Sequence, residues 1–211
     1  MIAAFIPIKL NSERVKGKNF RLLKGKPLYE YVIDNAINAE CFDDIFIDTD
    51  SDILKAYALS KNLKIIDRLP DLTKNTANGN DLMRYWYKLY PEYNLYFQLF
   101  ATAPFLSSTS IKNAVNTLAT SATHDSIFSA EKTPGWFWMC GRPVNFRTSI
   151  LLRSQDALYL IKETTGLYGI KNTALELYQQ RVGANPIPFI VHGKETIDID
   201  SEEDFLAAKE I

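Results

Sequence analysis

The first 40 residues, MIAAFIPIKLNSERVKGKNFRLLKGKPLYEYVIDNAINAE, contain the pattern that decides the fold. Residues 2–8 form an uninterrupted apolar run, which is typical of a strand that is buried on both faces. Residues 27–40 begin with a proline and carry apolar side chains at helical spacing, which predicts an amphipathic helix. A buried strand followed by such a helix is the first half of a βαβ unit.

The same alternation continues along the chain. We expect further strands near 44–48, 63–67, 94–100 and 125–131, and helices near 50–62, 79–90 and 107–120. Later elements are expected as strands near 144–146, 165–170 and 186–191 and as helices near 171–180 and 201–211. This order predicts an α/β fold with a mostly parallel sheet and helices on both faces, because βαβ crossovers cover a sheet in that way.

The length and composition fit one globular domain over residues 1–211. Apolar residues make up 46% of the 211 positions and charged residues 23%, which excludes disordered, collagen-like and disulfide-scaffold chains. The net charge is −1, which argues against nucleic acid or an anionic membrane as a partner bound through bulk positive charge. Residues 132–170 break the rhythm and contain Trp136, Phe137 and Trp138, which form either local core or a small inserted lobe for dimerisation.

The two cysteines and the N-terminus bear on the compartment. Cys41 and Cys140 are far apart and lack metal-ligand spacing, as expected of reduced thiols in the cytoplasm. No apolar run approaches the length of a membrane span. No basic region precedes the apolar start of the chain, so we expect no signal peptide and a cytoplasmic location.

A basic loop follows the first strand. Seven of its 18 residues, 9–26, are Lys or Arg, and only Glu13 is acidic. Ligands of open α/β sheets bind beyond the carboxyl ends of strands, and backbone amides there, with Asn11 and Ser12, can bind phosphate oxygens. Lys9, Arg14 and Lys18 could neutralise a triphosphate and a departing pyrophosphate. The Walker and dinucleotide glycine patterns are absent, so phosphate binding here would depend on side-chain charge. The alternative to phosphate binding is a basic loop that is only solvated.

A pair of acids stands near the other end, in the stretch TIDID at 196–200. In an extended segment Asp198 and Asp200 point to the same side. Two such carboxylates can hold Mg²⁺, which bridges phosphate oxygens. The pattern alone favours two solvated acids at the end of a strand, and only its combination with the basic loop favours a metal site.

Taken together, these motifs resemble those of the CMP-sugar-acid synthetases, the acylneuraminate-type cytidylyltransferases. The opening IPIKLNSERVKGKN with GKPL resembles the family's I-P-A-R-x-x-S-x-x-x-x-x-K-N and G-K-P-L, and DTDSDI at 48–53 resembles S-T-D-S-x-x-I. Residues 67–82 resemble the segment that holds base and ribose. ATAPFL at 101–106 resembles P-T-S-P-L-R, and IDIDSEEDF resembles the metal-binding I-D-I-D-x-x-x-D.

The resemblance implies a Rossmann-like nucleotidyltransferase that uses CTP and Mg²⁺. Such an enzyme transfers CMP to an acidic acceptor, most often a nonulosonic-type sugar acid, releases pyrophosphate and is usually a homodimer. By position in the motifs, Lys18 would contact the phosphates and Asn19 the nucleotide. Cytosine and ribose would lie against Arg68, Ala77 and Asn78, and Asp198 and Asp200 would bind the metal.

The departures from the family pattern concern the acceptor side, where Phe100 and Thr102 are expected. Lys9 replaces an arginine and keeps the charge but loses the bidentate fork. Phe100 replaces a glutamine and Leu106 an arginine, which removes polar contacts to a carboxylated sugar. Three interpretations therefore stay open: a sugar-acid acceptor, a phosphonate or other small acid as acceptor, and a nucleotide-binding homologue without catalysis.

Overall fold

The predicted N-terminal strand lies at the centre of the sheet. In the computed structural model, which describes residues 1–12, 15–74, 76–150, 153, 156 and 158–211, β1 (Ile2–Pro7) has parallel strands on both sides. These neighbours are β4 (Asp44–Thr49) and β6 (Leu95–Leu99). A central parallel strand needs apolar residues on both faces, which is why residues 2–8 show no alternation.

Seven strands of the described residues form one sheet in the order β11-β7-β10-β6-β1-β4-β5. The remaining members are β5 (Lys64–Asp67), β7 (Ser126–Thr133), β10 (Leu160–Lys171) and β11 (Pro186–Ile190). Only β10 runs antiparallel to its neighbours, β6 and β7. The predicted α/β fold with a mostly parallel sheet is confirmed.

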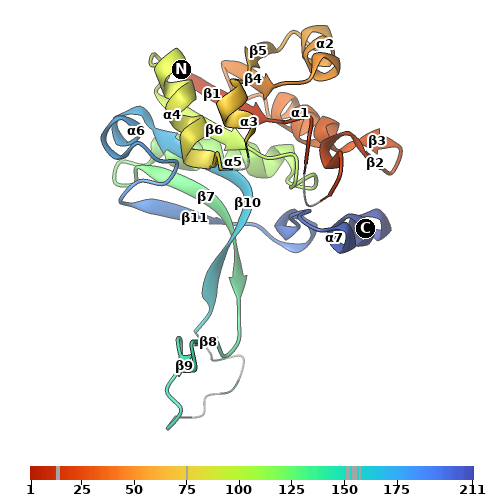
Figure 1. Ribbon diagram of the computed structural model, residues 1–211. Helices are drawn as coiled ribbons and strands as arrows, with labels where there is room; N and C mark the ends of the chain where they lie inside the picture. The colour runs from red at the N-terminus through yellow and green to blue at the C-terminus, as the bar shows by residue number, and fades with distance from the viewer. Residues whose placement is uncertain (13–14, 75, 151–152, 154–155, 157) are drawn as a thin grey trace.

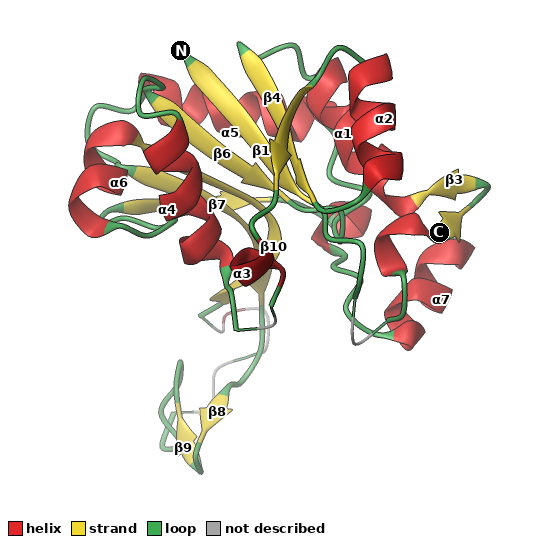
Figure 2. Cartoon of the chain, turned by 45° about the horizontal axis from the view of Figure 1, so that its top comes forward, coloured by secondary structure: helices red, strands yellow, loops and turns green. Residues whose placement is uncertain are grey.

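Helices cover both faces of the sheet (Figure 2). One face carries α1 (Leu28–Asn38), α2 (Asp52–Ser60) and α5 (Ser108–Thr120), and the other carries α4 (Gly79–Leu89) and α6 (Asn172–Tyr178). Residues of β1 alternate between the two cores, with Ala4 and Ile6 in one and Ala3 and Phe5 in the other. No helix of the described chain has the length and apolar character to cross a membrane.

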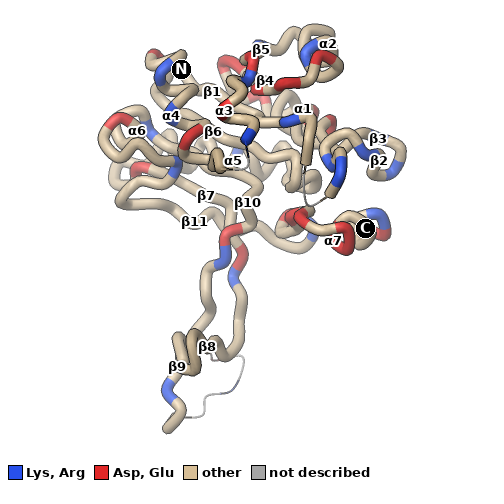
Figure 3. The backbone as a smooth tube through the Cα atoms, viewed as in Figure 1, with Lys and Arg blue, Asp and Glu red and all other residues tan. Residues whose placement is uncertain are grey.

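A long arm extends from the sheet between β7 and β10 (Figure 1). At its tip, β8 (Trp138–Met139) pairs with β9 (Arg142–Pro143). Figure 3 shows charged residues at the base of the arm and mostly uncharged residues toward its tip. Trp138 and Met139 are 57% and 68% exposed, so this tryptophan is not part of a buried core.

Two predictions about the arm need correction. The lobe expected at 132–170 is shorter, because Leu167–Lys171 pair with β6 inside the central sheet. The strand expected near 144–146 lies at β9 instead. The Asn145 side chain accepts a hydrogen bond from the amide of Phe137 and donates to Gly135 O, so it connects loop segments at this position.

The hairpin at the end of the basic loop and the C-terminal helix lie side by side. β2 (Leu22–Leu23) and β3 (Lys26–Pro27) form a hairpin, and α7 (Glu202–Glu210) packs beside it (Figures 1 and 2). Leu23 and Leu28 share a small core with Ile199 and Phe205. This contact brings the basic loop and the late acidic pair to the same edge of the sheet.

Candidate active site

A cavity of about 470 Å³ opens at the carboxyl ends of the central parallel strands, where ligands of open α/β sheets bind. Pro7 ends β1 and Lys9 follows it, Arg68 follows β5, and Phe100 follows β6. The full lining is Pro7, Lys9, Ser12, Val15, Lys18, Asn19, Arg68, Leu72, Lys74, Ala77, Asn78, Gly79, Leu82, Phe100, Ala101, Thr102, Thr165, Arg181, Asp198 and Asp200. Segments that are up to 193 residues apart in sequence thus form one site.

Most of the site residues predicted from sequence line this cavity. They are Lys9, Ser12, Lys18, Asn19, Arg68, Ala77, Asn78, Phe100, Thr102, Asp198 and Asp200. Asn11 is exposed and does not line it, and Arg14 lies outside the described residues. Leu106, the site of a departure from the family motif, is buried in the hydrophobic core at 4% exposure.

Lys18 connects the two charged clusters. It begins the short 3₁₀ helix η1 (Lys18–Phe20) and is buried at 7% exposure. Its Nζ donates to the carbonyl oxygen of Ile199 at 2.5 Å and pairs with Asp200 Oδ1 at 3.4 Å. A buried ammonium is strongly destabilised without such partners, so this contact fixes the distance between the basic loop and the acidic pair.

The remaining basic residues of the loop have other roles. Arg21 pairs with Glu202 at 2.5 and 2.8 Å and lies over the Phe205 ring at 4.0 Å, so it attaches α7 to the N-terminal hairpin. Lys26 pairs with Asp34 on α1. Lys16 and Lys24 are exposed and do not line the cavity. Within the described loop only Lys9 and Lys18 bring positive charge to the cavity.

Asp198 has the features of a cation ligand. Its Oδ1 is buried and has no hydrogen-bond partner among the described residues, whereas Oδ2 accepts from the Thr165 hydroxyl. Burial raises the pKa of Asp198, the hydroxyls of Thr165 and Thr102 oppose this rise, and Asp200 adds to it. Burial and the neighbouring Asp200 thus both disfavour the ionised form of Asp198. A bound cation would offset both effects by stabilising the negative charge.

The donor set fits Mg²⁺ in a nucleotide complex. In the described part of the chain no cluster of three or more His, Cys, Asp or Glu side chains could hold a metal. Asp198 and Asp200 would supply two carboxylates, and phosphate oxygens and water would complete the shell. Mg²⁺ is usually bound in this way, through one or two carboxylates plus substrate phosphates.

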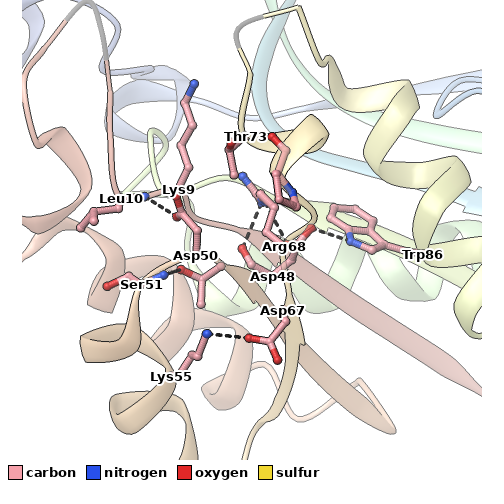
Figure 4. Close-up of polar contacts among 12 residues, drawn as sticks. Lys9, Leu10, Asp48, Asp50, Ser51, Lys55, Asp67, Arg68, Thr73 and Trp86 are labelled. Atoms are coloured by element: carbon pink, nitrogen blue, oxygen red, sulfur yellow. Dashed lines mark hydrogen bonds and ion pairs between the residues drawn. The ribbon is translucent and has the colours of Figure 1, made fainter.

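A buried ion pair supports the part of the cavity that Arg68 lines (Figure 4). Arg68 donates from Nε to Asp48 Oδ1 at 2.9 Å and from Nη2 to Asp48 O at 3.0 Å. Trp86 Nε1 donates to Asp48 Oδ2 at 2.8 Å. Burial raises the pKa of Asp48, and the Arg68 guanidinium opposes that rise. Since the guanidinium is held in this way, it presents a fixed surface to the cavity.

Two of the three predicted asparagines, Asn19 and Asn78, hold the backbone around the cavity in place. Asn19 Nδ2 donates to Lys9 O at 3.1 Å, which fixes the loop after β1. Asn78 caps α4, and its Oδ1 accepts from the amides of Asn80 and Asp81 at 2.8 and 3.3 Å. Leu10 N donates to Asp50 Oδ1 at 2.7 Å, which connects the loop to the end of β4 (Figure 4).

Thr165 was missed in the sequence because its position depends on an irregularity in β10. The register with β7 shifts between Glu163 and Tyr168, and Thr165 has a φ of 51°. Bulges next to active sites redirect side chains, and this one places the Thr165 hydroxyl on Asp198. A single threonine in a strand pattern gives no sequence signal for that contact.

Arg181 was also missed. It lies in the turn between α6 and β11, and its backbone amide donates to Asn80 Oδ1 at 3.0 Å. Its guanidinium carbon is 3.7 Å from the centroid of the Tyr168 ring and 6.0 Å from that of Phe100. Only the folding of this turn onto the start of α4 brings it to the cavity.

Comparisons with known proteins agree with this geometry. The profile of a family described as cytidylyltransferase matches residues 3–198. The N-acylneuraminate cytidylyltransferase A of Danio rerio is 25% identical over 99% of this chain and 50% of its own length. The N-acylneuraminate cytidylyltransferase of Streptococcus agalactiae serotype III is 31% identical over 63% of this chain and 33% of its own length. The chain thus spans half or less of these curated relatives.

The fold recurs in a solved structure of a CMP:2-keto-3-deoxy-manno-octonic acid synthetase in complex with CTP. The TM-score is 0.72 with 16% identity, and the alignment covers all of both chains. At this identity the likeness concerns the fold alone. It shows that the chain in that CTP complex has a fold similar to this one.

The Asp48–Arg68 pair allows a test of the structure around the cavity. Asp48→Ala leaves a buried guanidinium without its carboxylate, which we expect to lower the free energy of unfolding by about 3–5 kcal/mol. The measurement is urea denaturation followed by circular dichroism. Asp67→Ala is the matched control, since Asp67 ends the neighbouring strand, its side chain is 81% exposed and it pairs with Lys55. Equal stability of the Asp48 variant and the control would contradict the described pair.

Proposed function

The chain belongs to the cytidylyltransferase family, and on that basis we propose that it transfers CMP from CTP to a nonulosonic-type sugar acid and releases pyrophosphate. The observation that carries this proposal is the single cavity that gathers Lys9, Lys18, Arg68, Asp198 and Asp200. Both curated relatives are named for an N-acylneuraminate, which supports a sugar acid as acceptor.

In the proposed reaction an acceptor hydroxyl oxygen attacks the α-phosphorus of CTP in line with the departing pyrophosphate. Little covalent chemistry is required of the protein, so positioning and charge neutralisation account for most of the rate. Lys9 and Lys18 lie where they can neutralise the triphosphate and the leaving group, with Arg14 in the same loop by sequence. At Asp198 and Asp200, Mg²⁺ when bound supplies further neutralisation of phosphate oxygens.

The base side of the proposed site is formed by Arg68, Ala77 and Asn78. Arg68 is immobilised by Asp48, and Asn78 by its capping role in α4. Rigid groups suit the recognition of a planar base, because little side-chain entropy is lost on binding. Phe100 and Thr102 stand on the acceptor side, where Phe100 offers an aromatic edge in place of a polar amide.

The proposal extends to the assembly and its location. The exposed apolar side chains along the arm, which include Trp138, Met139 and Leu158, support a homodimer in which the arm contacts a second copy. A cytoplasmic location agrees with two unpaired cysteines, Cys41 and Cys140, and with the cytoplasmic supply of CTP that such an enzyme needs.

The activity is tested by pyrophosphate release. We expect turnover with CTP, Mg²⁺ and a sugar acid, chosen from N-acetylneuraminic acid and 2-keto-3-deoxy-manno-octonic acid, and at least a 100-fold preference for CTP over ATP. Turnover only with a phosphonate or another small acid would change the acceptor class. CTP binding by calorimetry without turnover of any acid would indicate a homologue without catalysis.

The metal assignment is tested at Asp200. Because one ligand of a charge-stabilising ion is lost, we expect Asp200→Asn to lower kcat by about 100-fold or more. Steady-state rates across a magnesium titration give the readout. Glu203→Gln, an exposed acid three positions on in the same stretch, should keep the wild-type rate. Full activity of Asp200→Asn would contradict the assignment of Asp200 as a metal ligand.

The arm is tested by the oligomeric state. Met139→Glu places a charge on an exposed apolar tip, and desolvating that charge at an interface is costly. We expect the wild-type protein to sediment as a dimer and Met139→Glu as a monomer at micromolar concentration. Arg153→Glu, at an exposed position of the same arm, serves as a charge control. A monomeric wild-type protein would contradict the homodimer.

A further inference from the structure

The wall of the cavity around Phe100 contains one cation that neither the basic loop nor the Asp48 pair explains. Arg181 lines the cavity, and among the described residues no carboxylate pairs with its guanidinium. It lies instead over the Tyr168 ring, with its central carbon 3.7 Å from the ring centroid. A guanidinium stacked on an aromatic face keeps its in-plane N–H donors available at its edge.

The stacking partners are themselves fixed. The Tyr168 hydroxyl donates to Glu163 Oε2 at 2.5 Å, and the Tyr168 and Phe100 rings meet edge to face with centroids 6.1 Å apart. Tyr168 is fully buried. These two rings form an aromatic wall, and Arg181 is the charged group on it.

The backbone of Arg181 is held from two directions. Its amide donates to Asn80 at the start of α4, and Arg84 Nη1 donates to Gln179 O in the same turn at 2.9 Å. A Cβ on Gly79 would come within 2.6 Å of Arg181 Nη1. The glycine therefore leaves the space that the guanidinium occupies, which places the cation against the first turn of α4.

Arg181 also resolves the apparent loss of polar groups on the acceptor side. Leu106, which stands where the family motif has an arginine, is in the core and cannot contact a ligand. Phe100 has no polar atom. Arg181 brings five N–H donors and a positive charge to the wall that Phe100 forms, and its planar fork matches a carboxylate in bidentate geometry.

We propose that Arg181 binds the carboxylate of the acceptor and thereby makes the site selective for an acid. This inference rests on the proposed CMP transfer to a sugar acid. Lys9 lies in the loop after β1 and Lys18 contacts the acidic pair. These two lysines can neutralise the triphosphate without Arg181. The Arg181 guanidinium is therefore available to bind the acceptor acid.

The test compares an acid with its neutral analogue. Pyrophosphate release is measured at saturating CTP with N-acetylneuraminic acid and 2-keto-3-deoxy-manno-octonic acid, and with the carboxamide of whichever acid the wild-type protein uses. We expect Arg181→Gln to raise the acceptor KM for the acid by about 10- to 100-fold, as for the loss of a charge-assisted hydrogen bond. The KM for CTP and the rate with the carboxamide should stay within about twofold of wild type.

Two variants separate recognition of charge from a structural role. Arg181→Lys keeps the charge without the fork and should recover part of the preference for the acid over the carboxamide. Arg84→Gln removes a contact to the same turn but does not line the cavity, and should leave that preference unchanged. A structural role of Arg181 would lower the rates with acid and carboxamide together, and this result would overturn the inference.

The remaining outcomes are distinct. An unchanged acceptor KM in Arg181→Gln, or a raised KM for CTP in its place, overturns the role of Arg181 while CMP transfer stands. Turnover of neither acid by the wild-type protein overturns the proposed function and this inference with it.

Discussion

The contact of Lys18 with the main chain at Ile199 and with Asp200 is the interaction on which the site depends. It joins residues that are 181 and 182 positions apart and is shielded from solvent on the lysine side. Around it, the Leu23–Phe205 core and the Arg21–Glu202 pair hold the N-terminal hairpin against α7. The basic loop and the acidic pair are therefore parts of one local structure.

The sheet explains why the other groups reach the same place. β1, β4, β5 and β6 are parallel, so the residues that follow them emerge at one edge. β10 runs the other way, because the chain returns from the arm, and its bulge lies at that edge too. Thr165 is placed on Asp198 by this bulge, and Tyr168 supports Arg181 from the same strand.

The sequence was sufficient for most elements of the central sheet and its covering helices and for the family, because these depend on local pattern and ordered motifs. The apolar run at 2–8 predicted the central strand, and the basic loop and TIDID predicted half of the polar lining. Pairings that depend on tertiary structure could not be predicted. Asp48 lies in a strand pattern that gives no sign of its partner Arg68, and the turn that carries Arg181 has no periodicity. After the arm, the chain re-enters the sheet between β6 and β7 and pairs antiparallel with both. This pairing sets the direction of β10 and the length of the arm, and no local pattern encodes it.

The central claim is that the basic loop and the acidic pair act as one unit in binding a magnesium–nucleotide. The most direct measurement is a double-mutant cycle with Lys18→Met and Asp200→Asn, in which calorimetry gives the free energy of binding of CTP with Mg²⁺. Groups in one network show interaction energies of about 0.5–3 kcal/mol, whereas independent sites add within about 0.3–0.5 kcal/mol. The account predicts a coupling of at least about 1 kcal/mol between the two positions. Additive effects on CTP binding would contradict it.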